Sequence, residues 1–395
     1  MSGFKVIKGN KTSDDRHADR EILKHRIIKV LRVVALFAAL IFVIWLLHRL
    51  YQNTTFNDYD ILSKAMRQDS DTSEYIAYNG HILKLSRDGA EAFEGNGKAI
   101  WNVTYEMQDP HAATCGDFVA IADEQGTEIY VASSAEDQGK ISTKLPILDI
   151  CVSRQGVVAA VLEDSGTSWI RLFDKNGDEL ASVKCSMAES GYPMDISLSP
   201  SGYLLGVAYT RVEGDAMRSS VAFYNFGDVG ANESDHYMSG YDFEGTLIPR
   251  VKFLNDSTAF AIGTDKMIIF SGDQKPEKSF EYSFDTRIKG VFYSEDRIVL
   301  VRESANDGGY AASVFNLAGE ELLSIPFDLD YIDVQVSKKR IVIYSDTHML
   351  IYDLRGTIKY DGPLDDSTLL VSTTNNARRY ILVNRETVKT IQLVK

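Results

Sequence analysis

The distribution of hydrophobic residues divides the chain into two unlike parts. Residues 33–47 read VVALFAALIFVIWLL and contain neither a charge nor a proline. With the apolar residues just ahead of it, this stretch reaches about 20 residues, enough for one helix to cross a bilayer. From Tyr75 onward the pattern changes to short apolar runs of β type, separated by Gly, Asn, Asp and Ser. The pattern therefore predicts one transmembrane helix, residues 27–51, and a β-rich domain, residues 75–395.

The β-type runs repeat roughly every 40–50 residues. The recurring unit is an apolar strand, then a small polar residue, two variable residues and a Gly, which supplies the positive φ of a tight turn. Clear copies lie at Leu85–Gly89, Phe173–Gly177, Phe315–Gly319 and Tyr352–Gly356, and looser ones end at Val131, Tyr224 and Phe270. Upstream of most copies lies a second unit, in which a polar turn joins a strand to a very apolar strand, as in LDICVSRQGVVAAVL.

Each repeat predicts a four-stranded antiparallel sheet. Its second strand, such as VVAAVL at 157–162, is apolar throughout because neighbouring sheets cover both of its faces. A lone sheet of this kind would expose those faces, so the sheets must pack radially and close into a ring. A β-sandwich would not show the period. We therefore predict an all-β fold, a β-propeller of seven or eight blades, with eight preferred.

The ends of the β-rich domain predict how the ring closes. The first unit, Tyr75–Asn96, lacks an inner strand, and the last, Thr368–Lys395, lacks an outer strand. Such complementary ends are expected if the two termini complete the ring together. Residues 52–74 are polar and acidic. We interpret them as a stalk between membrane and ring, with a short helix over Tyr59–Arg67.

Charge adds an orientation to the predicted membrane helix. The first 50 residues contain ten Lys/Arg and four Asp/Glu, so 32 of the 42 Lys/Arg and 52 of the 56 Asp/Glu follow them. By the positive-inside rule, the basic tail, residues 1–26, lies in the cytoplasm and the ring outside it. A cleaved signal peptide is disfavoured because 32 residues precede the apolar core and His48–Gln52 offers no small-x-small cleavage site. The prediction is a single-pass protein of the cell membrane.

Composition excludes some classes of partner. The part after residue 50 carries a net charge of about −20, which argues against binding nucleic acid or lying flat on anionic lipid. Its three cysteines, Cys115, Cys151 and Cys185, are too few for a disulfide framework. We interpret them as buried thiols, although one bridge stays open.

The repeated strand–[FY]-[DNS]-x-x-G–strand units resemble the blades of WD-repeat-like and quinoprotein-like propellers. Together with the basic tail and single span, they resemble an uncharacterised bacterial family of membrane-anchored propellers, a domain of unknown function. The resemblance covers about 80% of the chain and implies the fold. The Gly-His and Trp-Asp signatures of WD repeats are missing. Only Trp101 and Trp169 lie in the predicted ring, so no quinone cofactor is implied.

Motifs for catalysis, cofactors or metals are not recognised. The sequence DKNGDE at 174–179 resembles the start of a calcium loop, but Glu179 stands where an EF-hand requires Gly. We interpret it as a turn between strands. His111 and Cys115 are four residues apart without a second pair of ligands. A loop histidine and a core cysteine fit them better than a zinc site.

Three aspartates recur at the second position of the inner-strand units: Asp149, Asp195 and Asp333. Inner strands line the central channel of a propeller, so these residues would ring one channel mouth and bind a cation or a basic ligand. The preferred interpretation is that each aspartate bonds local backbone where its strand starts. They are nevertheless the recurring charged positions that we would mutate first.

These patterns favour a membrane-tethered, extracytoplasmic and non-enzymatic module. It would bind or scaffold an envelope protein, a cell-wall component or an extracellular ligand. One alternative is a propeller hydrolase or lyase that uses channel carboxylates. Another is a single-pass sensor, although the 32 residues before the apolar core contain no recognisable effector domain. The sequence does not identify the ligand or the oligomeric state.

Overall fold

The computed structural model describes residues 29–46, 49, 54–67, 73–135, 138–186, 190–304, 308–365 and 367–395. The predicted cytoplasmic tail, residues 1–26, lies outside the described residues. Contacts divide the chain into two units, Met1–Thr55 and Phe56–Lys395. In the first unit one helix, Lys29–Leu46, is long and apolar enough to cross a membrane. Its 18 residues span about 27 Å.

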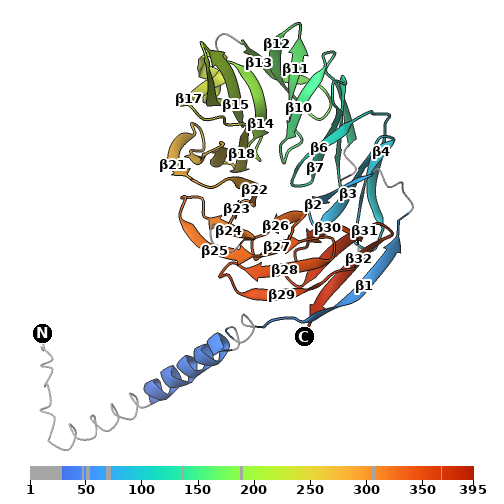
Figure 1. The fold of residues 1–395 in the computed structure, drawn as a ribbon, viewed down its shortest axis with the longest axis vertical. Helices are drawn as coiled ribbons and strands as arrows, with labels where there is room; N and C mark the ends of the chain where they lie inside the picture. Colours follow the sequence, from blue (N-terminus) through green and yellow to red (C-terminus); the bar gives the residue numbers. More distant parts are fainter. Residues whose placement is uncertain are drawn as a thin grey trace, which may run out of the picture. The chain divides into compact units, whose positions relative to one another are not determined.

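The second unit is an eight-bladed β-propeller, in which each blade is a four-stranded antiparallel sheet. Figure 1 shows the sheets following one another around a ring. Counted from the ring centre outward, the strands of blades 1 to 4 are β2 (Glu74–Tyr78), β3 (His81–Ser86), β4 (Gly89–Phe93) and β5 (Ala99–Thr104); β6 (Pro110–Cys115), β7 (Phe118–Asp123), β8 (Glu128–Ser133) and β9 (Gln138–Ser142); β10 (Ile147–Val152), β11 (Val158–Asp164), β12 (Thr167–Phe173) and β13 (Glu179–Cys185); β14 (Tyr192–Leu198), β15 (Leu204–Glu213), β16 (Ala216–Asn225) and β17 (Tyr237–Glu244).

Blades 5 to 7 follow the same plan, and blade 8 combines both ends of the unit. Their strands are β18 (Arg250–Asn255), β19 (Thr258–Ile262), β20 (Lys266–Ser271) and β21 (Glu277–Ser283); β22 (Ile288–Tyr293), β23 (Ile298–Glu303), β24 (Tyr310–Phe315) and β25 (Glu321–Phe327); β26 (Asp333–Val336), β27 (Arg340–Tyr344), β28 (His348–Asp353) and β29 (Ile358–Pro363); β30 (Thr368–Thr373), β31 (Arg379–Asn384), β32 (Thr387–Val394) and β1 (Asp58–Met66). Two 3₁₀ turns, η1 (Gly230–Asn232) and η2 (Ser234–His236), lie between β16 and β17.

Strand β1 closes the ring, which corrects two predictions. It pairs antiparallel with β32, from Asp58 opposite Val394 to Met66 opposite Thr387. The helix predicted over Tyr59–Arg67 is therefore wrong, and the propeller begins at Phe56 instead of Tyr75, inside the predicted stalk. The segment is rich in residues that also favour helix, but pairing with the free edge of β32 overrides that local propensity.

The turn of the first repeat also differs from the prediction. Its inner strand is present as β2, and Ser86–Gly89 joins the second strand to the third. The turn equivalent to the other Gly turns is Glu94–Lys98, between β4 and β5. Two glycine turns a few residues apart both fit the motif, and only the pairing of the strands distinguishes them.

A side-chain cap explains why the motif repeats. In the third-to-fourth turns of three blades, the first residue uses Oδ1 to accept hydrogen bonds from the backbone N–H groups two and four positions later. These residues are Asp174, Asn316 and Asp353. The Gly three positions later has a positive φ of 77–96°. The oxygens of Asp174 are thus engaged by the turn, as its interpretation as a strand connection requires.

The core lies between the blades. Eight apolar clusters of the described residues each join two neighbouring blades, and together they fill all eight interfaces. The second strands are buried most completely, as in Val158–Leu162, where no side chain is more than 1% exposed. One cluster joins blade 8 to blade 1 through residues such as Ile82 and Val383. Ring closure therefore buries apolar surface at every interface.

Candidate functional site

The three aspartates predicted at the ring centre lie on inner strands. Asp149 is on β10 of blade 3 and Asp195 on β14 of blade 4. Each is the first paired residue after a β-bulge, so the residue before it is skipped in the ladder. Bulges re-aim the side chains beside them. Asp333 begins β26 of blade 7, four blades from blade 3 and therefore on the opposite side of an eight-bladed ring.

Asp149 and Asp195 bond the backbone. Asp195 Oδ2 accepts a hydrogen bond from the Val251 N–H at 2.8 Å, and Ser197 Oγ accepts one from the Phe253 N–H at 3.0 Å. Both bonds cross from β14 to β18, the inner strand of the next blade. Asp149 Oδ1 accepts a hydrogen bond from the Ile150 N–H at 2.8 Å. These bonds give both residues a structural role at the ring centre.

Asp333 does not join the other two. Its Oδ2 accepts a hydrogen bond from Gln335 Nε2 at 2.6 Å and one from the Tyr344 hydroxyl at 3.4 Å. In the two blades between, the equivalent inner-strand positions are Arg250 and Gly290. The structure therefore brings together a pair of carboxyl groups beside an arginine, and the third carboxyl lies across the ring.

Burial perturbs the acid pair. It raises the pKa of Asp149 to about 7, and the charge of Asp195 adds to the rise. Burial also raises the pKa of Asp195 to about 6, against the opposing effects of the Val251 N–H, Lys252 and Arg250. Desolvation penalises a charged carboxylate, and a neighbouring carboxylate penalises it further. Near neutral pH the pair therefore carries less than two full negative charges.

Lys252 was missed by sequence reasoning. It lies on β18 between the buried residues Val251 and Phe253 and lines a cavity of about 200 Å³ with Cys115, Cys151 and Tyr293. A lysine that interrupts an apolar inner strand is the one signal that the sequence offers, and it looks like any strand lysine.

Three charged residues join distant blades at the end of the ring where the first-to-second turns lie. Arg154 Nη2 lies 2.7 Å from Glu295 Oε1, and Lys338 Nζ lies 2.8 Å from Glu295 Oε2. They lie on first-to-second turns of blades 3, 6 and 7. We call them the Glu295 cluster. Asn255 Nδ2 also donates a hydrogen bond to the Glu295 carbonyl oxygen at 3.2 Å, which adds blade 5.

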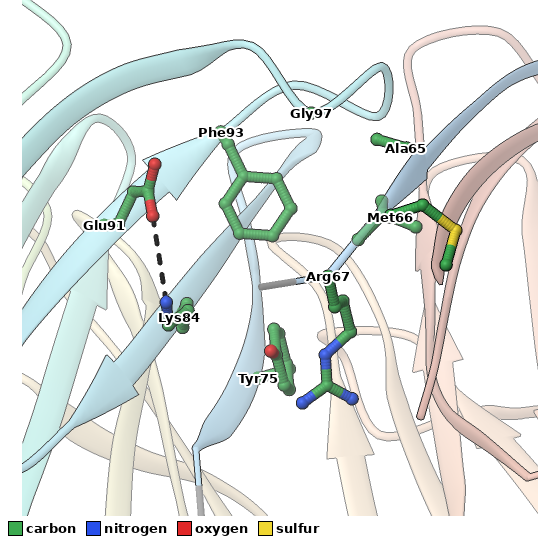
Figure 2. A pocket seen from close by; sticks show the side chains of 9 residues that line it. Ala65, Met66, Arg67, Tyr75, Lys84, Glu91, Phe93 and Gly97 are labelled. Atoms are coloured by element: carbon green, nitrogen blue, oxygen red, sulfur yellow. Dashed lines mark ion pairs between the residues drawn. The ribbon is translucent and has the colours of Figure 1, made fainter. Parts of the chain in front are cut away.

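A second cavity, of about 440 Å³, lies where β1 meets blade 1. Figure 2 shows the guanidinium of Arg67 beside the ring of Tyr75, with a distance of 4.6 Å from Cζ to the ring centroid. Arg67 Nη1 also donates a hydrogen bond to the Asn384 carbonyl oxygen at 2.8 Å. Lys84 and Glu91 form an ion pair in the same wall, at 3.9 Å. Arg67 thus connects blades 8 and 1 and has a structural role at the seam.

The cysteines are free thiols. Cys151 and Cys185 are buried and Cys115 is partly buried. Burial raises the pKa of all three thiols, so they are protonated at neutral pH. His111 lies on the same strand as Cys115 instead of in a loop. Four strand residues span about 13 Å, which is too far for both side chains to bind one metal ion.

Comparison with known structures identifies the same architecture in proteins of very different sequence. BamB from Moraxella catarrhalis is 12% identical, with a TM-score of 0.51, over 85% of this chain and 100% of that chain. Sqt1 from Chaetomium thermophilum, bound to the N-terminus of the ribosomal protein L10, is 12% identical with a TM-score of 0.53, again over 85% and 100%. Sqt1 from Saccharomyces cerevisiae is 10% identical with a TM-score of 0.52, over 87% and 100%.

Likeness at this level of identity shows the fold alone. No curated protein sequence matches the chain. A family model does match it, over residues 52–393, and the match begins before β1 and ends in β32, so it includes both partners of the ring closure. The chain therefore belongs to a family of unknown function, DUF5711.

Proposed function

We propose that the protein is a membrane-tethered, extracytoplasmic binding module that holds a basic segment of a protein partner. The proposal rests on the uneven charge of the two rims of the ring. The loop rim consists of the loops between blades, such as Tyr105–Asp109 and Asp328–Ile332, and the turns between second and third strands. The turn rim consists of the first-to-second and third-to-fourth turns, including the Glu295 cluster.

The loop rim is acidic. Its described loops and turns contain five basic residues, Arg67, Arg87, Lys144, Arg287 and Arg385, against twelve acidic ones, Asp88, Glu106, Asp109, Glu124, Asp215, Asp265, Asp285, Asp328, Asp330, Asp346, Asp365 and Glu386. The inner strands also begin at this rim, which places Asp149, Asp195 and Asp333 near it. A ring of acidic loops around a further acid pair complements a basic ligand and speeds its encounter. The described turns of the turn rim also contain twelve acidic residues, but nine basic residues offset most of them, so the net charge is −3 there against −7 on the loop rim. This difference in net charge is the observation that carries the proposal.

The comparisons support a protein partner in general terms. Sqt1 from Chaetomium thermophilum is a propeller bound to the N-terminus of another protein, so a ring of this architecture can hold an end of a polypeptide. Helix Lys29–Leu46 supports tethering by its length and composition. The basic residues that precede it support a cytoplasmic tail and an external ring.

Photo-crosslinking in membranes tests the binding surface. A photoreactive residue at Asp330 or Asp215, both exposed on the loop rim, is expected to trap a reproducible protein neighbour. The matched control is Asp273, which is equally exposed on the turn rim and is expected to trap none. With the photoreactive residue at Asp215, replacing Asp328, Asp330, Asp346 and Glu386 by Asn or Gln is expected to abolish the crosslink. Equal crosslinking from Asp273, or a crosslink unaffected by these replacements, would overturn the proposal.

Protease accessibility tests the orientation. Protease added outside intact cells is expected to reach the ring and leave a protected fragment that contains the tail and the helix. Cleavage of the ring only after the cells are opened would place it in the cytoplasm and contradict the proposal. Release of the ring without the helix from untreated cells would identify a cleaved signal peptide instead of an anchor.

A further inference from the structure

The cavity beside Lys252 lies at the turn rim, away from the acidic loops. The inner strands of five consecutive blades, 2 to 6, supply residues to its wall. Its volume is about 200 Å³, which is room for a group of several heavy atoms, since one water occupies about 30 Å³ in the liquid. The residues that matter for its chemistry are Lys252, Cys115, Cys151, Tyr293 and Arg154.

Lys252 is the unusual member of this wall. Its side chain is partly buried, and within the described part of the chain its Nζ makes no hydrogen bond and no ion pair. Its one polar contact there is with the face of the Tyr293 ring, 6.0 Å from Nζ to the centroid. Charged groups taken out of water are ordinarily paired, because an unpaired charge costs several kcal/mol of desolvation. Lys252 is therefore a partly buried cation without an anionic partner among the described residues.

The surroundings keep Lys252 charged without neutralising it. Burial alone would lower the pKa of Lys252, but Tyr293, Cys151, Asp195 and Cys115 outweigh burial, and the pKa is raised. The two thiols are neutral because burial raises their pKa. Asp195 is engaged with the Val251 N–H. Asp149, whose pKa Lys252 also lowers, accepts a hydrogen bond from the Ile150 N–H. Both acids that interact with Lys252 thus have hydrogen-bond partners of their own.

Glu295 does not supply the missing anion either, because it is already paired with Arg154 and Lys338. The Arg154 guanidinium also lines the cavity. This cluster has two cations and one anion, so it adds no negative charge that Lys252 could use. It lies at the mouth of the cavity, on turns that reach across the rim.

We propose that this cavity binds one small anionic group, a carboxylate or a phosphate, which pairs with Lys252. Neutral thiols and an aromatic face lie beside Lys252 in the wall, and a charge-assisted hydrogen bond from its ammonium group to an anion is stronger than one between neutral groups. The same chemistry is available from a free small anion and from the C-terminal carboxylate of a protein. The site is separate from the acidic loop rim, and the proposal does not depend on the basic partner proposed there.

The test uses the full-length protein in detergent, with inorganic phosphate and acetate as probes at constant ionic strength in chloride. The readout is the rate at which a neutral maleimide alkylates Cys115, assigned with Cys115→Ser. Saturable protection of Cys115 by a probe is expected. In Lys252→Gln the apparent Kd is expected to rise at least about tenfold, and Lys252→Arg, which keeps the charge, is expected to restore protection.

The matched control is Lys289→Gln. Lys289 is an exposed lysine on β22, the inner strand of the next blade, and it pairs with Glu303 on β23. This variant is expected to leave protection unchanged. Equal protection in wild type and Lys252→Gln would overturn the proposal. So would the absence of saturable protection by either probe in wild type, a result that stands even if the Gln variant fails to fold.

A second arm distinguishes the two sources of the anion. A short peptide with a free C-terminal carboxylate is compared with the same peptide amidated. Protection by the carboxylate peptide alone, at lower concentration than acetate, assigns the site to a protein terminus. Protection by phosphate or acetate but by neither peptide assigns it to a free anion. Failure of the acidic loop rim to bind a partner would leave both of these results unaffected.

Discussion

Arg154 and Glu295 form an ion pair at 2.7 Å although they are 141 residues apart in sequence and two blades lie between theirs in the ring. The pair therefore reaches across the turn rim instead of joining neighbouring blades. Lys338, one blade further on, contacts the other oxygen of the same carboxylate at 2.8 Å. Hydrogen bonding from Lys338 outweighs partial burial and lowers the pKa of Glu295, so the carboxylate stays ionised at neutral pH. One side chain thus connects blades 3, 6 and 7 over the mouth of the Lys252 cavity.

Replacing Glu295 by Gln is expected to loosen this mouth more than it destabilises the fold. Both partners of the Arg154 pair are about half exposed, so the loss in the free energy of unfolding should be about 0.5–1 kcal/mol. The rate of maleimide alkylation of Cys115, which lines the cavity, is expected to rise several-fold. The control is Glu281→Gln, which removes an ion pair with Lys266 at 3.1 Å on blade 5, away from the mouth. An unchanged Cys115 rate in Glu295→Gln would show that the cluster does not cover the cavity.

The turns that repeat around the ring provide a matched pair of variants. Asp353 and Asp174 cap equivalent turns, but Asp353 also lies 3.2 Å from Nζ of Lys359, which is only 2% exposed. Asn can keep the Oδ1 cap in both. Asp353→Asn is therefore expected to lower the free energy of unfolding by about 3 kcal/mol, because it removes a carboxylate from a buried ammonium group. Asp174→Asn is expected to change it by less than about 0.5 kcal/mol.

Denaturant unfolding at pH 7 measures the free energy of unfolding of both variants. The pH dependence adds a signature of its own, because the pKa of Asp353 is lowered to about 2: burial would raise it, but bonds from Arg355, Thr357 and Lys359 outweigh burial. Its contribution is present above the unfolded pKa near 4 and is lost as the pH falls from about 4 to about 2. The gap between wild type and Asp353→Asn should close over that range. Equal destabilisation of Asp353→Asn and Asp174→Asn would contradict the role of Lys359.

The sequence predicts the parts of this fold that are local. The Asx–x–x–Gly turn and the apolar second strands recur because each blade needs the same cap and the same two-sided burial, so the period and the propeller follow from them. Strand β1 could not be predicted in this way, since its partner β32 lies more than 300 residues away. Residues 58–66 read DYDILSKAM, and nothing in that run alone distinguishes an outer strand from a helix.

The candidate site likewise has a part that follows from the local repeat and a part that depends on contacts across the ring. Asp149 and Asp195 recur at one position of the repeat, so their proximity follows from the packing of adjacent blades. Asp333 occupies the same position, but the distance round the ring depends on the blade count, which the sequence left at seven or eight. The pairing of Arg154 with Glu295 depends on how turns of separate blades meet over the mouth. Lys252 stands in the wall of a cavity without a hydrogen bond or ion pair in the described part of the chain, and that placement is a property of the folded ring.

The raised pKa of Asp149 is expected to make the free energy of unfolding depend on pH. Burial raises the pKa of Asp149 to about 7 from an unfolded value near 4, so the folded state binds more protons between these values. Stability conferred by this group is therefore lost as the pH rises from about 4 to about 7. Asp149→Asn removes the titrating group. It is expected to be more stable than wild type at pH 8, by about 1–3 kcal/mol, and similar to it at pH 4.

Denaturant unfolding from pH 4 to pH 8 measures this difference, with Asp195, Lys252 and Arg250 left in place as the charged neighbours. The comparison at pH 4 is the internal control, since the wild-type carboxyl is then neutral like the amide. A constant difference between variant and wild type across the range would mean that Asp149 titrates normally. A difference that grows toward low pH would reverse the sign and exclude desolvation as the dominant effect.

Ring closure through β1 leads to the last prediction. Phe56 is 6% exposed and packs in the cluster between blades 7 and 8, and its N–H donates to the Lys359 carbonyl oxygen at 2.8 Å. Met66, at the other end of β1, is 66% exposed. Phe56→Ala should therefore destabilise the protein by about 3 kcal/mol, and Met66→Ala by less than about 0.5 kcal/mol. Limited proteolysis should cut the β1 segment much faster in Phe56→Ala, because the strand is anchored chiefly at that end. Equal cleavage of both variants would mean that pairing with β32, rather than burial of Phe56, holds the closing strand.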